Sequence, residues 1–190
     1  MDYFQHFEQL LAFHSAPTLA GIKTGSLISI NKQKLKNFQQ IKQKYSKCLK
    51  CSNVYMFTVS DSTNYRLLLI YNKDKLRQLL SQKSIQEFLQ SYGYKDFTNI
   101  LACLRYLKIR MLLQKGFPHE IGIFLGYPLA DVKGFIKNNG QNFKCCGPWK
   151  VYADLAAAEK LFSQYAQCSQ RFCKCLANGF SLEDIIGQAV

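Results

Sequence analysis

The sequence predicts an α+β fold: a small, mainly antiparallel sheet of about three to four strands covered by helices. Segments 53–60 and 64–72 are rich in β-branched and aromatic residues, and the turn sequence Asp61-Ser62-Thr63 separates them. Several other segments repeat apolar residues at helical spacing. A chain of 190 residues can bury one sizeable core and is short for two. We therefore expect a single domain over residues 1–190.

The elements before this hairpin come from apolar spacing and from helix breakers. Residues 2–13 are expected to form a short helix. A loop follows, because Pro17, Gly21 and Gly25 interrupt regular structure, and a short strand is expected over 27–30. Residues 32–50 hold seven lysines and no acid. Their apolar positions predict an amphipathic helix with a lysine face; these positions are Leu35, Phe38, Ile41, Tyr45 and Leu49.

Helices dominate the chain after the hairpin. Residues 73–91 are expected to be helical, with a break near Ser81 and an end at Gly93. Asp96 is expected to cap the next helix, which has basic residues up to Lys115 and stops at Gly116. Its apolar stripe is Phe97, Ile100, Leu101, Leu104, Leu107 and Met111.

The C-terminal third combines one strand with two helices. Residues 142–152 are interpreted as a third strand, interrupted by Gly147-Pro148. Asp154 is expected to cap a long helix with a clear apolar face, and 178–187 predict a short final helix.

Charge and cysteine content narrow the function classes. The net charge of +13 favours acidic partners: nucleic acid, an anionic membrane surface or a phosphate-bearing ligand. An anionic small molecule or an acidic protein is the partner expected, with nucleic acid as an alternative. No apolar run reaches the length of a membrane span, and the N-terminus lacks the pattern of a signal peptide. We expect a cytoplasmic protein whose eight cysteines stay reduced.

Residues 117–138 have the spacing of a helix-turn-helix-like corner. Gly122 suits a close helix crossing, Gly126 suits the turn, and Val132 suits the buried side of the second helix. A nucleic-acid-binding regulator that uses this corner and the lysine-rich helix is therefore an alternative function. The chemistry of the second helix argues against it, because its first residues, Pro128 to Asp131, offer little to base edges.

Two histidines are the main candidates for chemistry. His14 lies where the first helix meets its loop, and His119 follows Pro118 in the first turn of a helix. We predict that both are catalytic groups or metal ligands, with Glu120 as an acid, a base or an orienting group. The cofactor is unknown; a metal or haem is the hypothesis. Further ligand-binding positions are expected at Ser15, Thr18, Lys23, Tyr127, Trp149 and Tyr152.

Adjacent thiols at Cys145 and Cys146 cannot easily bind one metal, because neighbouring side chains of a strand point to opposite faces. One thiol is therefore expected in the core and the other at the surface. Cys48-x-x-Cys51 has the spacing of half a metal site, but nothing in the sequence places a second half beside it.

Three segments resemble a known family: FHSAPTLAGIK (13–23), FPHEIGIFLGYPLADVKGFI (117–136) and CCGPWKVYAD (145–154). They are similar to proteins of anaerobic Firmicutes catalogued as domain of unknown function 3793. The resemblance implies a cytoplasmic bacterial protein of one domain, linked to redox or iron metabolism, and it implies no established activity. Relatives often have cysteine where this chain has Ser15, so either a thiol is not required there or this chain has lost it.

Our preferred hypothesis is a small-ligand or metal- or haem-linked protein of anaerobic metabolism. Its pocket would combine the 14–23 loop, the 117–128 corner and the 145–152 strand. The nucleic-acid-binding regulator is the first alternative, and a basic interaction module for an acidic protein is the second. Whether the protein is an enzyme stays open.

Overall fold

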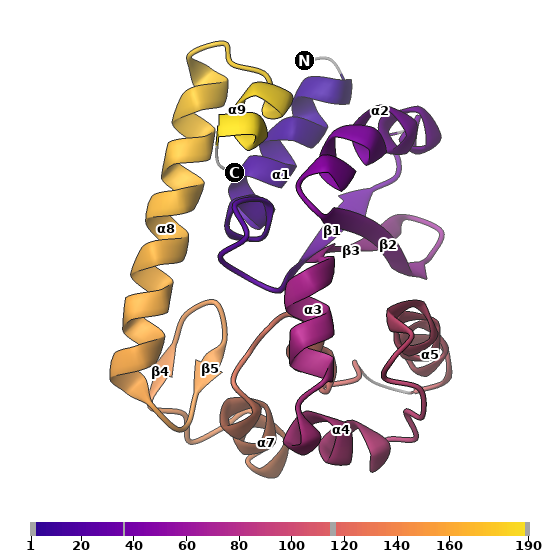
Figure 1. Cartoon of the computed structure of the whole chain (residues 1–190), viewed down its shortest axis with the longest axis vertical. Helices are drawn as coiled ribbons and strands as arrows, with labels where there is room; N and C mark the ends of the chain where they lie inside the picture. The colour runs from indigo at the N-terminus through magenta and orange to yellow at the C-terminus, as the bar shows by residue number, and fades with distance from the viewer. Residues whose placement is uncertain (1–2, 36, 115–116, 189–190) are drawn as a thin grey trace.

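The structure, a computed structural model, describes residues 3–35, 37–114 and 117–188. It confirms the α+β class, with one three-stranded antiparallel sheet and a separate two-stranded sheet (Figure 1). The strands are β1 (Gly25–Asn31), β2 (Val54–Asp61), β3 (Tyr65–Asn72), β4 (Cys145–Cys146) and β5 (Lys150–Val151). The helices are α1 (Tyr3–Leu19), α2 (Phe38–Cys51), α3 (Lys73–Leu80), α4 (Lys83–Gln90), α5 (Ile100–Leu113), α6 (Ile121–Phe124), α7 (Leu129–Lys137), α8 (Leu155–Ala177) and α9 (Leu182–Gln188).

The three-stranded sheet has the order β1-β3-β2, and both pairings are antiparallel. The predicted hairpin is β2–β3. Near its turn, the Arg66 Nη2 donates to Asp61 Oδ2 at 2.9 Å. The register of β2 shifts between Thr58 and Ser60, which marks a bulge.

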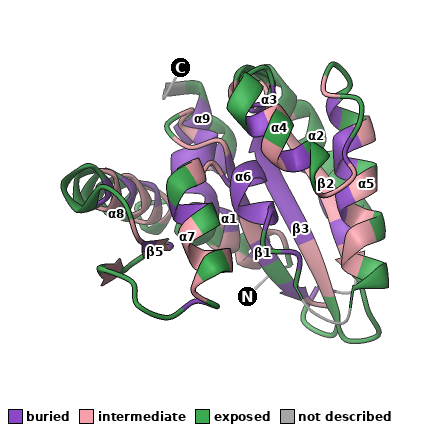
Figure 2. Cartoon of the chain, turned by 90° about the horizontal axis from the view of Figure 1, so that it is seen from below, coloured by how far each residue is buried: buried purple, intermediate pink, exposed green. Residues whose placement is uncertain are grey.

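Alternating side chains of the sheet enter two different apolar clusters, so both faces are covered. On β3, Leu68 and Ile70 belong to the first cluster, whereas Leu69 and Tyr71 belong to the second. Figure 1 shows the sheet between α1 and α2 above and α3, α4, α5 and α7 below, and Figure 2 shows that β3 is buried along its second half. The sheet is therefore the middle of three layers.

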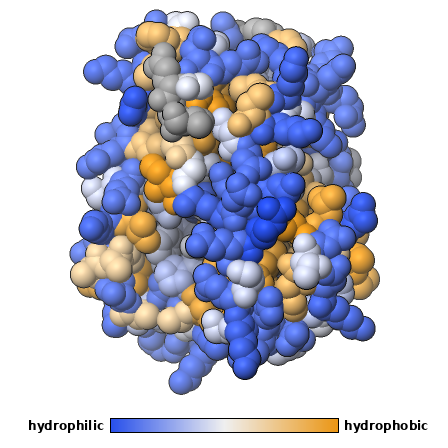
Figure 3. Space-filling view, in the orientation of Figure 1, coloured by the Kyte–Doolittle hydropathy of each residue, from blue (hydrophilic) through white to orange (hydrophobic). Residues whose placement is uncertain are grey.

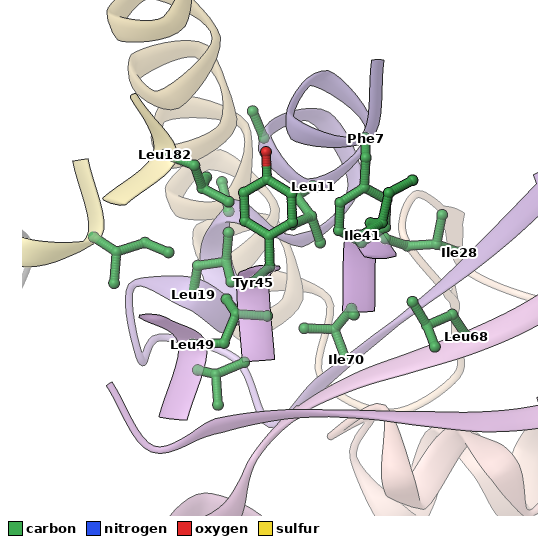
Figure 4. Packing of buried hydrophobic residues seen from close by; sticks show 14 of the residues in the cluster. Phe7, Leu11, Leu19, Ile28, Ile41, Tyr45, Leu49, Leu68, Ile70 and Leu182 are labelled. Atoms are coloured by element: carbon green, nitrogen blue, oxygen red, sulfur yellow. The ribbon is translucent and has the colours of Figure 1, made fainter. Parts of the chain in front are cut away.

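The first face is covered by α1, α2 and α9, with α8 packed along α1. Figure 4 shows the side chains of this cluster converging from these helices and from the sheet. The predicted lysine-faced helix is α2, but it begins at Phe38 and not at residue 32, so Leu35 lies before it. The five predicted apolar positions are all buried: Leu35, Phe38, Ile41, Tyr45 and Leu49. Hydrophilic side chains cover much of the face seen in Figure 3, with smaller hydrophobic areas between them.

The second face is covered by α3 to α7. The break near Ser81 is confirmed, because α3 ends at Leu80 and α4 begins at Lys83. The predicted cap of α5 is wrong: Asn99, not Asp96, accepts from the Ala102 amide. Asp96 instead accepts from Thr98 and Asn99, in a turn just before the helix. The predicted end of this helix, at Lys115 and Gly116, lies outside the described residues.

The first helix is longer than the sequence predicts. The segment from His14 to Leu19 was expected to be a loop, but α1 continues through Pro17. Pro17 cannot donate to the carbonyl of Phe13, a residue that is 66% exposed and open to solvent. Residues 15–19 are all buried, so the burial of this turn outweighs the local effect of proline.

The predicted third strand of the sheet is a separate hairpin, β4–β5. Gly147-Pro148-Trp149 reverses the chain, and the Gly147 amide donates to the Trp149 carbonyl at 3.1 Å. The hairpin packs on α8, where a Cβ on Gly147 would lie 2.4 Å from the Phe162 ring. The Asp154 cap of α8 is confirmed, with its carboxylate accepting from the Ala157 amide. Within the described residues, no helix has the length and apolarity needed to cross a bilayer.

Candidate ligand site between the helical corner and the hairpin

The corner formed by α6 and α7 has the close crossing that the glycines predict. Its first helix is a single turn, Ile121–Phe124. A Cβ on Gly122 would lie 2.9 Å from Val132, so a larger side chain would push α6 and α7 apart. Gly126 has φ +79° and lies against Thr24, which brings the loop before β1 up to the corner.

The carboxylate of Asp131 links the hairpin to α7 through hydrogen bonds. Its Oδ1 accepts from the amides of Tyr152 and Ala153, at 2.8 and 2.9 Å, and its Oδ2 accepts from Trp149 Nε1 at 2.8 Å. The side chain is 3% exposed. The Asp131 carboxylate is therefore turned towards the hairpin and is not presented to solvent. One feature of the sequence could have indicated this position of Asp131. The single tryptophan has an indole N–H that needs an acceptor when it is buried, and this chain has few acids that could accept from it.

Trp149 lies at the centre of an aromatic cluster. Its ring stacks on Tyr127 at 5.1 Å and meets Phe162 edge-on at 4.5 Å between centroids. The Tyr127 hydroxyl donates to the Pro148 carbonyl at 3.0 Å. The predicted ligand-binding residues Tyr127 and Trp149 are thus brought together, and they join the corner to the hairpin.

A cavity of about 300 Å³ opens between the corner and the hairpin. Aromatic and aliphatic side chains form most of its wall, and its polar groups come from His119, Cys146, Lys150 and Asp131. The full lining is Phe117, His119, Ile121, Gly122, Leu125, Tyr127, Asp131, Val132, Phe135, Cys146, Gly147, Trp149 and Lys150.

Two polar side chains hold defined positions at this cavity. The exposed His119 ring meets Phe135 edge-on, with centroids 4.9 Å apart. Lys150 Nζ donates to the Gly140 carbonyl at 2.7 Å and lies 4.7 Å from the Phe143 ring centroid. Phe135 and Lys150 were absent from the sequence prediction, because only the fold brings α7 and β5 together.

The two neighbouring thiols differ in exposure, although neither is a fully buried core residue. Cys145 is half-buried and packs against the cluster around Trp149. Cys146 is exposed and lines the cavity. The exposed thiol of the pair is therefore Cys146.

Glu120 lies beside His119 in the chain but not in the cavity lining. Its carboxylate is 1% exposed and forms an ion pair with Arg110. Tyr94 donates a long hydrogen bond of 3.4 Å to the same oxygen. Burial, and then the charge of Glu120, raises the pKa of Tyr94 well above its ordinary value. Glu120 therefore links α6 to α5, and its position does not suit an acid or base for a cavity ligand.

The fold does not bring His14 and His119 together. His14 lies in a separate groove with His6 and Cys173, between α1 and α8, and burial lowers its pKa. Across the described ranges, no group of three His, Cys, Asp or Glu side chains is placed to hold a metal ion. The predicted His14–His119 metal pair has no support in this arrangement.

Three more predicted ligand-binding residues lie outside the cavity lining. The Ser15 hydroxyl is buried on α1 without a hydrogen-bond partner among the described residues. The Thr18 hydroxyl shares a 2.8 Å hydrogen bond with Ser26. Tyr152 packs over Gly134, where a Cβ would lie 2.5 Å from its ring. Thr18 and Tyr152 therefore join neighbouring elements.

Lys23 approaches the aromatic cluster from the loop between α1 and β1. Its Nζ lies 5.4 Å from the Tyr127 ring centroid and 5.6 Å from that of Tyr165. Burial lowers the pKa of Lys23 to about 8. Of the predicted residues, Lys23, Tyr127, Trp149, His119 and Cys146 therefore lie in one region.

The comparisons with known proteins identify a family but do not identify an activity. No curated protein and no solved structure matches the chain. One family model matches residues 11–186, a range that contains the cavity and all three segments on which the resemblance rests. The chain therefore belongs to the family described as "Protein of unknown function (DUF3793)".

Proposed function

We propose that this protein binds a small ligand with a planar apolar part and an anionic group in the cavity between the corner and the hairpin. The supporting observation is the cavity itself. Its volume of about 300 Å³ suits a small molecule, and its wall is mainly aromatic and aliphatic, with few polar groups.

The charge at the cavity favours an anionic group on the ligand. Lys150 and His119 supply hydrogen-bond donors or positive charge. The carboxylate of Asp131 accepts three hydrogen bonds from the hairpin, which offset its negative charge. A planar apolar group would meet Phe135 and Trp149, whose ring faces and edges suit it.

A fluorescent probe tests this proposal directly. The single tryptophan, Trp149, lines the cavity, so its emission reports on occupancy. We expect 8-anilino-1-naphthalenesulfonate, which has aromatic rings and a sulfonate, to bind at one site and quench Trp149. His119→Gln should weaken this binding severalfold, whereas His14→Gln should not, because His14 lies in the other groove.

A matched pair of cysteine variants separates cavity binding from general surface binding. Cys146→Phe places a ring in the cavity, and Cys51→Phe places one on the exposed end of α2. We expect Cys146→Phe to weaken dye binding by tenfold or more, and Cys51→Phe to leave it unchanged. Equal dye binding by both variants, or no change in Trp149 emission, would refute the cavity proposal.

Nucleic-acid binding is a second proposal, supported by the inward position of Asp131. The exposed side of α7 then presents Lys133 and Lys137, and Lys144 is exposed on the hairpin side. The lysine face of α2 cannot be assigned to the same surface, since α2 and α7 pack against opposite faces of the sheet (Figure 1).

Salt-dependent DNA binding tests the second proposal. A Lys133→Glu, Lys137→Glu variant should lose binding to a mixed-sequence duplex at low salt, and a Lys42→Glu, Lys47→Glu variant should retain it. An equal loss in both variants would indicate attraction by net charge alone. The predicted acidic protein partner stays a prediction.

A further inference from the structure

We propose that Cys48 and Cys51 form a dithiol site that exchanges with small disulfides and closes into a disulfide at the end of α2. The site is on a helix that covers the first face of the sheet, so it is separate from the cavity and does not depend on the ligand proposed there. Three observations carry the inference: the position of both thiols on one side of a helix end, their unequal exposure, and the basic groove that both of them line.

Both thiols lie on one side of α2. Residues three apart on a helix are neighbours, with Cβ atoms about 5 to 6 Å apart. The two cysteines line the same groove. The Cys51 thiol is turned back towards the preceding turn of the helix, because its Sγ donates to the Lys47 carbonyl at 3.4 Å. The Cys51 sulfur therefore lies on the side of the helix that also presents Cys48.

The end of α2 allows the two thiols to come closer. A disulfide needs Cβ atoms about 3.5 to 4.5 Å apart, so the last turn must tighten by about 1 to 2 Å. The Ser52 amide donates to the Leu49 carbonyl at 3.1 Å. The Asn53 amide donates to the Lys50 carbonyl at 3.0 Å, and the helix ends there, with φ +57° at Asn53. Both bonds join residues three apart, as in a 3₁₀ turn, where side chains at this spacing eclipse each other.

The two thiols differ in their access to solvent. Cys51 is exposed, whereas Cys48 is half-buried and packs against the first apolar cluster. Burial raises the pKa of Cys48 to about 11, and the nearby charges of Glu183 and Cys51 add to this shift. A small disulfide therefore reaches Cys51 first, and Cys48 stays a thiol until a mixed disulfide forms beside it.

The groove at these thiols is basic. It has a volume of about 390 Å³, and Lys44 and Lys47 line it together with the two cysteines. Glu183 of α9 is the one acid among its described lining residues, so positive charge exceeds negative charge there. Such a groove attracts a disulfide that carries carboxylates. A zinc site needs at least three protein ligands, and the part of the chain that the structure describes places no third ligand beside the two thiols.

The exchange is balanced in two steps. The Cys51 thiolate attacks one sulfur of a disulfide RSSR, so that a Cys51–SR bond forms, the S–S bond of RSSR breaks, and RS⁻ leaves and takes up a proton. Cys48 then loses its proton and attacks the Cys51 sulfur, which forms the Cys48–Cys51 bond and releases a second RSH. The two protein thiols are oxidised to one disulfide, and RSSR is reduced to two RSH.

Glutathione disulfide, which carries carboxylates, tests the proposal on the intact chain. The folded protein is incubated with it, quenched in acid and digested with trypsin without reduction. Because trypsin cuts after Lys50, mass spectrometry detects a Cys48–Cys51 bond as two cross-linked peptides. We expect this cross-link in the wild type, with little glutathione left on Cys51.

Two variants separate the steps. In Cys48→Ser we expect at least about ten times more glutathione on Cys51 than in the wild type, where the neighbouring thiol displaces it at a millimolar or higher effective concentration. Cys51→Ser should leave the half-buried Cys48 largely unmodified. Cys146 is the internal control: it is exposed, and the neighbouring Cys145 points to the other face of its strand, so its adduct should be equal in all three proteins.

Three results would overturn the proposal. The first is an equal amount of glutathione on Cys51 in the wild type and in Cys48→Ser. The second is a cross-link that forms only after the chain is unfolded in urea, because the folded helix end would then not close. The third is modification of Cys48 in Cys51→Ser at the rate found for Cys51 in the wild type, because the order of attack would then be wrong.

Discussion

The two faces of the sheet are stabilised in different ways. On the first face, α1, α2 and α9 pack an apolar cluster in which Phe7, Leu11 and Ile41 are fully buried (Figure 4). The second face and the adjoining hairpin contain both buried acids of the described chain, Glu120 and Asp131. There, the hydrogen bonds and ion pair of these two acids add to an apolar cluster of similar size. The hydrogen bonds of Asp131 hold the hairpin in place. The space between the hairpin and α7 therefore does not have to be filled by apolar side chains, and a cavity remains there.

The largest effect is expected on the first face. Leu11→Ala should lower the free energy of unfolding by about 3 kcal/mol, because a fully buried leucine leaves a void. Urea denaturation measures this change. Leu101→Ala is the control, since Leu101 is 47% exposed, and it should change stability by less than about 0.5 kcal/mol. Equal losses would contradict the assignment of the apolar core.

A slightly smaller loss is expected from Asp131→Ala, about 2 kcal/mol, because it leaves three donors of the hairpin without an acceptor. Trp149 emission should shift to longer wavelength as the indole meets water. Asp131→Asn keeps one acceptor oxygen and should lose less. If Asp131→Ala changes neither stability nor emission, the hydrogen bonds to Asp131 do not hold the hairpin on α7.

Two helical glycines should respond in opposite directions. Gly134→Ala forces a methyl group into the Tyr152 ring and should destabilise the protein by about 1 kcal/mol. Gly187→Ala meets nothing within 4 Å, so the higher helix propensity of alanine should stabilise it by up to about 1 kcal/mol. Thermal unfolding of both variants compares them. Only Gly134→Ala should weaken dye binding at the cavity.

The smallest effect is a pH dependence from Lys23. Its folded pKa of about 8 lies below the unfolded value, so the unfolded chain binds more protons between about pH 8 and 10.4. This group therefore makes the wild type more stable as pH rises through that window. Lys23→Met should be more stable than wild type at pH 7, by on the order of 1 kcal/mol, and the gap should narrow towards pH 10. A constant difference across this range would argue against a buried amine.

Features set by neighbouring residues were predicted correctly. The β2–β3 hairpin, the buried stripe of α2 and the Asp154 cap of α8 all follow from periodicity or from contacts a few residues apart. The glycines of the corner also revealed a close crossing, because Gly122 and Val132 are near in sequence. The candidate region was predicted in part, through Lys23, His119, Tyr127, Cys146 and Trp149.

Features set by distant contacts were missed. The sequence by itself determined the α+β class, the main hairpin and most helices, because the spacing of apolar residues and caps acts locally. Only the tertiary structure decided that α1 continues through Pro17, that Asp131 faces the hairpin, and that His14 lies apart from His119. Each of these depends on burial against a partner far away in the chain, and such burial can outweigh any local preference.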